Sequence, residues 1–234
     1  QVNFLRKLRE GNSKPIIVIV TGGGPVAMPE VEELADAILF VWYPGEEGGN
    51  AVGDILYGDA VPSGRLPVTF PRSVDQLPPF EDYSMNGRTY RFMEKEPLYP
   101  FGFGLSYTTF SFSDIRLSSN QLQKGKNLQV KVSVTNSGKR EAEEVVQLYV
   151  KPPKASFRVP FASLRGVKRV LLAPGERQDV EFTLTPEDLS VVDEKGNLVQ
   201  IEGTYEIVVG ESSPSPRSEA LGAATPVMGK IHIM

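Results

Sequence analysis

The stretch WYPGEEGGN at residues 42–50 decides how the first part of this chain folds. The apolar run AILFVWY leads into it, and it contains a Pro-Gly turn, two carboxylates and two further glycines. AVGDILYGD (51–59) continues with a helix-like pattern, and SGRLPVTFP (63–71) follows. This order predicts a strand, a tight loop and the N-terminus of a helix.

The segments on either side of this loop predict an alternating α/β arrangement. We expect helices at 2–10 and 48–57, a short acidic helix between the glycine turn and the second strand, and strands at 16–20, 38–43 and 65–70. The run IIVIV at 16–20 is apolar on both faces, which is typical of a strand buried between helix layers in a parallel sheet. Because about 75 residues make only half of such a sheet, we expect the remaining strands upstream, in a longer protein.

The texture of the chain then changes twice. Residues 76–107 are rich in prolines and aromatics, which predicts an irregular strap packed onto neighbouring domains. In residues 108–234, apolar and polar residues alternate with period two, for example at 128–134, 180–184 and 205–209. Turn signals separate these runs, so we predict about seven strands, without a helix, in an immunoglobulin-like β-sandwich.

Composition excludes several classes of function. There are no cysteines and a single histidine, His232, which excludes thiolate metal sites and makes a Ser-His-Asp arrangement within the chain improbable. The net charge is −4, without the clustered Lys and Arg that binding of nucleic acid requires. We therefore expect no nucleic-acid partner. No apolar run approaches the ~20 residues of a membrane helix, so we expect no membrane partner either.

The GGGP segment and the first residues of the chain both favour structural interpretations. GGGP at 22–25 lacks the spacing of a phosphate loop, and Pro25 has no N–H to donate, so a structural turn is expected. The chain starts at Gln1, rather than Met, in what already reads as a helix, and we expect it to be a segment of something longer.

The block 42–70, together with GRTYRF (87–92) and LYPFGFGLSYTTF (98–110), resembles the C-terminal part of glycoside hydrolase family 3, the β-glucosidase and β-xylosidase type. Residues 108–234 are similar to the fibronectin type III-like domain that many of these enzymes carry. The resemblance implies three parts: the end of an α/β sandwich domain (1–75), the strap (76–107) and the β-sandwich (108–234).

The resemblance also implies where the chemistry lies. In that family, the nucleophile is an aspartate on an N-terminal barrel-like domain, and the acid/base is typically a glutamate on the α/β domain, upstream of the segment seen here. No residue of this chain matches either motif, so we assign no catalytic residue. The implied partners are the remainder of the same enzyme and a β-linked glycoside, and the implied chemistry needs neither metal nor cofactor.

Four residues are candidates for the rim of a substrate pocket: Trp42, Glu46, Glu47 and Arg88. Adjacent carboxylates on one turn seldom face one another as a glycosidase dyad requires, so we expect Glu46 or Glu47 to cap the helix and position the loop. Trp42 suits either stacking on a sugar or core packing. Arg88 and Arg91 suit ion pairs across a domain boundary more than substrate contact.

The sequence therefore predicts the C-terminal portion of a retaining β-glycosidase, with its catalytic dyad elsewhere. The alternative is a non-catalytic carbohydrate-binding or structural module. That alternative needs an exposed row of aromatics on the sandwich, for which Tyr149, Phe157 and Phe161 are the candidates, although core placement suits them better.

Overall fold

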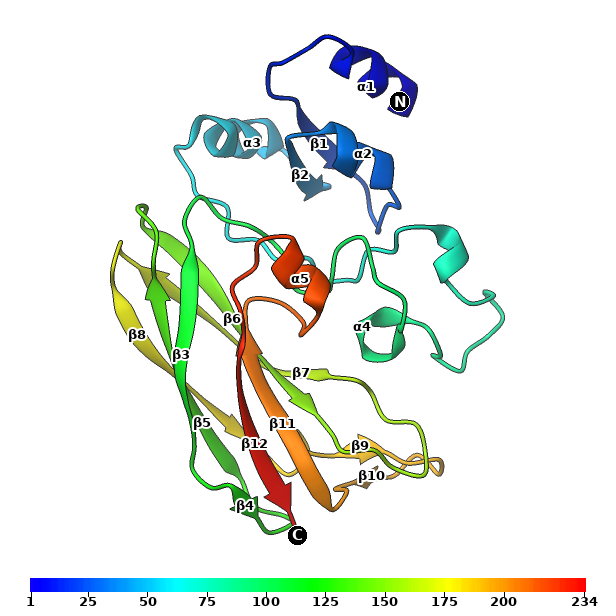
Figure 1. Ribbon diagram of the computed structural model, residues 1–234, viewed down its shortest axis with the longest axis vertical. Coiled ribbons are helices and arrows are strands. Elements are labelled where there is room, and N and C mark those ends of the chain that lie inside the picture. The colour runs from blue at the N-terminus through cyan, green and yellow to red at the C-terminus, as the bar shows by residue number, and fades with distance from the viewer.

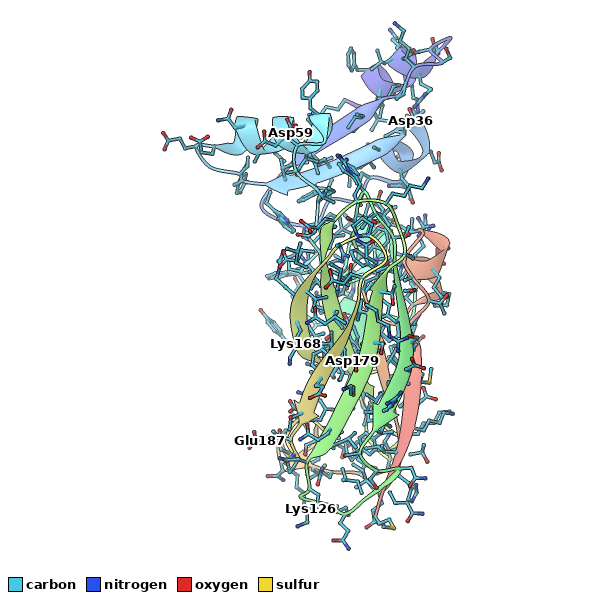
Figure 2. All side chains as sticks on the ribbon, turned by 90° about the vertical axis from the view of Figure 1, so that its left-hand side faces the viewer. Asp36, Asp59, Lys126, Lys168, Asp179 and Glu187 are labelled. Atoms are coloured by element: carbon cyan, nitrogen blue, oxygen red, sulfur yellow. The ribbon has the colours of Figure 1, made fainter.

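The computed structural model describes residues 1–234 and has an α/β part at one end and a long β-sandwich at the other (Figure 1). The first part contains α1 (Val2–Arg9), β1 (Ile17–Thr21), α2 (Pro29–Leu34), β2 (Ala37–Trp42) and α3 (Gly48–Tyr57). Figure 2 shows the same stacking from the side, with Asp36 and Asp59 in the α/β part and Lys126 and Glu187 toward the far end of the sandwich.

The α/β part is built on a two-stranded parallel sheet. β1 pairs with β2 from Ile17 opposite Ala37 onward. Arg9, at the end of α1, donates to the carbonyl of Leu34 and to Asp36 Oδ2, both at 2.6 Å. The same carboxylate oxygen of Asp36 accepts the Ile16 N–H at 2.7 Å. One carboxylate therefore joins the first helix to the start of both strands.

The α/β alternation is confirmed for two strands and three helices, but two details differ from the prediction. β1 is not covered on both faces: Ile17 is 50% exposed and Ile19 42% exposed. The third strand, expected at 65–70, is wrong, since only an isolated bridge joins Phe70 to Tyr99. Pro67 has no N–H to donate, and the Phe70 N–H bonds the strap carbonyl of Tyr99 at 2.9 Å, so this segment pairs with the strap and not with β1.

The strap is irregular: a 3-10 turn (Val74–Gln76) overlaps its first residue, and α4 (Thr89–Phe92) is its only helix. Side chains of the strap pack into the core of the α/β part. Phe70, at the entry to the strap, packs edge-on against Phe40 of β2, with ring centroids 5.1 Å apart, and against Tyr99 at 6.1 Å. Leu98 of the strap is fully buried in the same cluster. The strap therefore completes the core of the α/β part.

The sandwich consists of two mainly antiparallel layers around one large core. Its strands are β3 (Phe110–Leu117), β4 (Gln121–Leu122), β5 (Leu128–Asn136), β6 (Ala142–Lys151), β7 (Ser163–Leu172), β8 (Arg177–Leu184), β9 (Val191–Val192), β10 (Leu198–Val199), β11 (Gly203–Gly210) and β12 (Val227–Ile233). One sheet has the order β4-β12-β11-β6-β7, and the other has the order β3-β5-β8. The alternating residues face inward and contribute to a cluster of 22 buried residues. The predicted period of two is thus confirmed.

A helix interrupts the sandwich, contrary to the prediction of strands alone. α5 (Pro216–Ala220) connects β11 to β12, and its N-cap, Ser215, accepts the Arg217 N–H at 3.2 Å. Arg217 then donates to the carbonyl of Leu98 and pairs with Glu32 of α2. This helix is therefore a structural connection between the sandwich, the strap and the α/β part (Figure 1).

None of the helices has the length and apolar character that crossing a bilayer requires.

Candidate functional site

The candidate site lies at the carboxyl edge of the parallel pair β1 and β2. The GGGP turn (22–25) follows β1, and the loop 43–47 follows β2. The Gly22 N–H donates to the carbonyl of Trp42 at 3.3 Å, so the two loops start side by side. In open α/β sheets, ligands bind in the crevice outside the carboxyl ends of the strands. The sheet therefore presents both loops at the edge where this architecture recognises ligands.

Glycines make this close arrangement possible. A Cβ on Gly23 would lie 2.9 Å from the Tyr43 ring, and a Cβ on Gly48 would lie 2.5 Å from the Pro44 ring. Gly45 has φ +74°, a conformation that favours glycine. The loop after β2 is therefore a tight turn whose backbone lies close to its own side chains.

Both candidate carboxylates are exposed at this turn. Glu47 occupies the N-cap position of α3, but its side chain makes no capping bond to the backbone. Glu47 Oε2 accepts from Asn50 Nδ2 at 2.6 Å instead, and no hydrogen bond or ion pair involves the Glu46 side chain. The predicted side-chain cap is therefore wrong, since Asn50 holds the Glu47 carboxylate, while the Glu46 carboxylate is open to a ligand.

Trp42 lies between the core and the loop. Its ring packs edge-on against Phe40 at 4.7 Å and Phe70 at 6.3 Å between centroids, and the side chain is half-buried. Its φ of +52° lies in the left-handed region, which costs a non-glycine residue about 1–3 kcal/mol. This turn of the backbone directs the chain from β2 into the loop, while the ring stays with the core.

The arginines do not form the predicted ion pairs. Arg88 donates through Nη2 to the carbonyls of Pro79 (2.8 Å) and Asp82 (3.0 Å), and Arg91 donates to Ser163 Oγ at 3.0 Å. No carboxylate pairs with either guanidinium, because that of Arg88 bonds carbonyls of the strap and that of Arg91 bonds a serine of β7. No hydrogen bond or ion pair joins Arg88 to the loop 43–47, so the structure brings Trp42, Glu46 and Glu47 together but does not tie Arg88 to them.

A buried charge cluster that the sequence did not predict lies away from this edge. Arg65 Nη2 is 2.6 Å from Glu144 Oε2 and 3.9 Å from Glu211 Oε2. All three side chains are less than one-tenth exposed, so no sugar ring has room between the two carboxyls. A glutamate in the apolar run of β6 is the one sequence signal that could have revealed it.

Tyr149 is fully buried, and its ring packs edge-on against Tyr90, 5.9 Å away. Phe161, by contrast, is 50% exposed and lines a groove of about 620 Å³ between the strap and the sandwich. The predicted core placement is therefore confirmed for Tyr149 and wrong for Phe161. None of the four candidate rim residues lines this groove.

Comparison with known proteins matches both halves of the chain. The glycosyl hydrolase family 3 C-terminal domain matches residues 1–107, and the fibronectin type III-like domain matches residues 144–213. A periplasmic β-glucosidase of Salmonella typhimurium is 39% identical over 87% of this chain, and a putative β-xylosidase of Formosa agariphila is 41% identical over 86%. The chain spans only 28% and 27% of the length of these two relatives.

Solved structures give the same picture. A β-glucosidase from Erythrobacter marinus is 38% identical and superimposes on 93% of this chain with a TM-score of 0.79. The superimposed part is 28% of that enzyme's own chain. β-Glucosidase 3B from Thermotoga neapolitana, in complex with α-D-glucose, is 34% identical and covers 97% of this chain with a TM-score of 0.82. The present chain corresponds to 32% of that enzyme.

Proposed function

The chain belongs to glycosyl hydrolase family 3, of which it is a C-terminal segment, and we propose that it completes a retaining β-glycosidase. The complete enzyme would release terminal glucose or xylose from β-linked glycosides by double displacement. The names of the relatives, β-glucosidase and β-xylosidase, support these two sugars. The proposal divides the chain into the end of the α/β domain (1–75), the strap (76–107) and the sandwich (108–234).

The catalytic dyad lies outside these residues in this proposal. A retaining enzyme needs two carboxyls about 5–5.5 Å apart on either side of the sugar bond. The exposed pair here, Glu46 and Glu47, is adjacent on one turn, and the pair around Arg65 is buried and engaged with a guanidinium. The family resemblance implies that the dyad lies on an N-terminal barrel-like domain and on the first part of the α/β domain.

The observation that carries the proposal is the edge formed by the loops after β1 and β2. It presents the free carboxylate of Glu46 and the held carboxylate of Glu47 at the ligand-binding end of the sheet, with Trp42 behind them. In addition, β1 leaves Ile17 and Ile19 half-exposed, as expected of a strand that a further part of the α/β domain covers. The chain would thus contribute part of the pocket rim, and Arg88 would support it from the strap.

The rim assignment is tested in the complete enzyme. We expect Glu46→Gln or Glu47→Gln to raise KM for an aryl β-glucoside or β-xyloside by roughly 10–100-fold, because a hydrogen bond to a charged group is lost. Glu181→Gln, an exposed carboxylate on the sandwich, is the matched control and should leave KM unchanged. If both loop variants keep the KM and kcat of the unmodified enzyme, the rim assignment is wrong.

The position of the dyad is tested with the 234-residue chain alone. It should not hydrolyse aryl β-glucosides or β-xylosides, because it holds neither the nucleophile nor the acid. Reproducible turnover that Glu46→Gln abolishes would contradict the proposal and would place a catalytic carboxylate in this loop.

A non-catalytic carbohydrate-binding role is the second candidate, and Phe161 favours it. This ring is half-exposed in the groove between the strap and the sandwich, where its face can stack on a sugar. Under this proposal, the chain should be retained on insoluble glucan or xylan, and Phe161→Ala should abolish retention, whereas Phe80→Ala, exposed on the strap, should not. No retention of the unmodified chain would rule this role out.

A further inference from the structure

The joint between the strap and the sandwich contains three charged side chains that water barely reaches. Arg65 lies in the segment that leads into the strap, Glu144 lies in β6, and Glu211 directly follows β11. Their side chains are 6%, 0% and 9% exposed. The shortest contact joins Arg65 Nη2 to Glu144 Oε2 at 2.6 Å, and Glu211 Oε2 lies 3.9 Å from the same nitrogen.

Hydrogen bonds connect this cluster to the strap. Gln147 of β6 donates through Nε2 to the backbone carbonyls of Glu211 at 2.6 Å and Gly102 at 3.0 Å. The Tyr149 hydroxyl donates to Gln147 Oε1 at 2.6 Å, which fixes the orientation of the amide. The other carboxylate oxygen of Glu211 accepts the Ala224 N–H at 2.7 Å. The cluster, the strap and both strands thus form one buried polar network.

The charges in this network do not balance. An arginine stays protonated in proteins and supplies one positive charge, whereas two ionised glutamates supply two negative charges. The charged groups that face Glu144 are Arg65 and Glu211, and none of them offers a second positive charge. An unpaired buried charge is costly, and a buried carboxyl avoids this cost by taking up a proton.

The hydrogen-bond pattern leaves one carboxylate oxygen without support. Glu144 Oε1 is buried and no donor bonds it, so no hydrogen bond stabilises a negative charge on it, whereas Oε2 is held by Arg65. Burial raises the pKa of Glu144 to about 7 and, in the same way, raises the pKa of Glu211 above its ordinary value. A metal ion is a poor substitute for the proton here, since no group of three or more His, Cys, Asp or Glu side chains gathers to hold one.

We propose that Arg65, Glu144 and Glu211 form a proton-binding joint, which holds one proton in the folded protein and fastens the strap to the sandwich less tightly once that proton is lost. The two carboxyls share the proton as a coupled pair. Because Leu98 of the strap packs with Phe70 in the core of the α/β part, the charge of the joint also affects that part. The inference concerns the fold of this chain and does not depend on the proposed glycosidase activity.

The direction of the pH effect follows from linkage. A carboxyl that binds its proton more tightly in the folded state than in the unfolded state takes up more protons on folding between its two pKa values. For Glu144, this window runs from the ordinary value of 4.5 to about 7. The stability of the protein should therefore fall as the pH rises through this window and should level off above it.

Glu144→Gln tests the joint because glutamine imitates the protonated carboxyl at every pH. We measure the unfolding equilibrium constant in urea from pH 5 to pH 8 on the full chain. The constant of the unmodified protein, divided by that of Glu144→Gln, should rise by up to about tenfold per pH unit below pH 7 and then stay level. A ratio that does not change with pH would overturn the proposal.

The neighbouring residue provides the matched control. Glu143 lies next to Glu144 on β6, but its side chain is partly exposed and pairs with Arg169. The strand and the substitution are the same at both positions, and the two glutamates differ in their burial and in their ion pairs. Glu143→Gln should therefore show no rise in the same ratio between pH 5 and 7.

A second measurement needs no substitution in the joint. In the unmodified protein, carboxyl carbon NMR should show a glutamate that titrates above pH 6. The amide of Gly102 in the strap, which donates to Leu66, and the amide of Ser213, which donates to Phe101 of the strap, should lose protection as this group ionises. The amide of Val132 in the sandwich core should keep its protection over the same range. If all glutamates titrate below pH 5.5, the joint holds no proton and the proposal fails, even where Glu144→Gln does not fold.

Discussion

The sandwich and the α/β part bury their apolar residues in different ways. The sandwich holds a core of 22 buried residues, all drawn from its own strands and their connections. The principal cluster of the α/β part has only three buried residues: Met28, Phe70 and Leu98. None of the three lies in β1 or β2, and two of them, Phe70 and Leu98, come from the chain beyond α3. β1 itself leaves Ile17 and Ile19 half-exposed.

This difference shows which region is self-sufficient. Strands in which every second residue faces inward close a core between two sheets, and the residues of β5 and β8 alternate in this way. A parallel strand that is apolar on both faces needs a layer on each side, and here the strap covers only one of them. The sandwich therefore builds its core from its own sequence, whereas the α/β part depends on the strap for its core and leaves one face of β1 half-exposed.

The largest expected effect is a direct test of this contrast. Leu148→Ala, in the sandwich core, removes a fully buried side chain and should lower the free energy of unfolding by about 2–5 kcal/mol, because a cavity remains. Ile19→Ala, on the half-exposed face of β1, should cost less than about 1 kcal/mol. Urea unfolding followed by circular dichroism measures both.

The contrast fails if the two losses are equal. An Ile19→Ala loss as large as that of Leu148→Ala would mean that this face of β1 is covered within this chain, and the contrast between the two regions would be wrong. The same pair in the complete glycosidase proposed above sharpens the comparison, since the further α/β layer of that proposal should raise the cost at Ile19 and leave the cost at Leu148 unchanged.

The second prediction concerns the strap, on which the α/β part depends. A Cβ on Gly104 would lie 2.3 Å from the backbone carbonyl oxygen of Gly64, next to Arg65. Since neither backbone can yield cheaply, Gly104→Ala should lower stability by about 1–3 kcal/mol. Gly49→Ala, in α3, meets nothing within 4 Å and should instead be neutral or stabilise by about 0.5–1 kcal/mol. Thermal unfolding of both variants gives the sign, and a neutral Gly104→Ala would contradict the tight packing of the strap.

The sequence predicted the fold well where local patterns determine it. The period of two located β5, β8 and β11, and the WYPGEEGGN block located β2, the loop and α3. The expected strand at 65–70 failed because Pro67 removes a donor and the strap competes for the backbone, which is a tertiary effect. α5 was missed although Ser215 followed by Pro216 is a helix-start signal, because SSPSPRS (212–218) reads as low complexity.

The candidate site divides in the same way. Glu46, Glu47 and Trp42 are neighbours in the chain, so their common position was predictable, and the part they play at a pocket rim remains a prediction. The cluster around Arg65 was not predictable, because Arg65 and Glu144 are 79 positions apart and only the fold joins them. A charged residue inside an apolar strand, such as Glu144 in β6, indicates a buried partner but not which one.

The smallest expected effect compares a surface ion pair with the buried joint. Arg169 holds Glu143 by a hydrogen bond, which lowers the pKa of that carboxyl, so its contribution is present above the ordinary value and is lost as the pH falls. Because both side chains are partly exposed, Glu143→Gln should cost only about 0.2–1 kcal/mol at pH 7 and less at pH 3. This is the opposite sign of pH dependence from Glu144, one residue along the same strand. Urea unfolding at the two pH values decides it, since a loss at pH 3 equal to the loss at pH 7 would show that packing, and not charge, sets the contribution of Glu143.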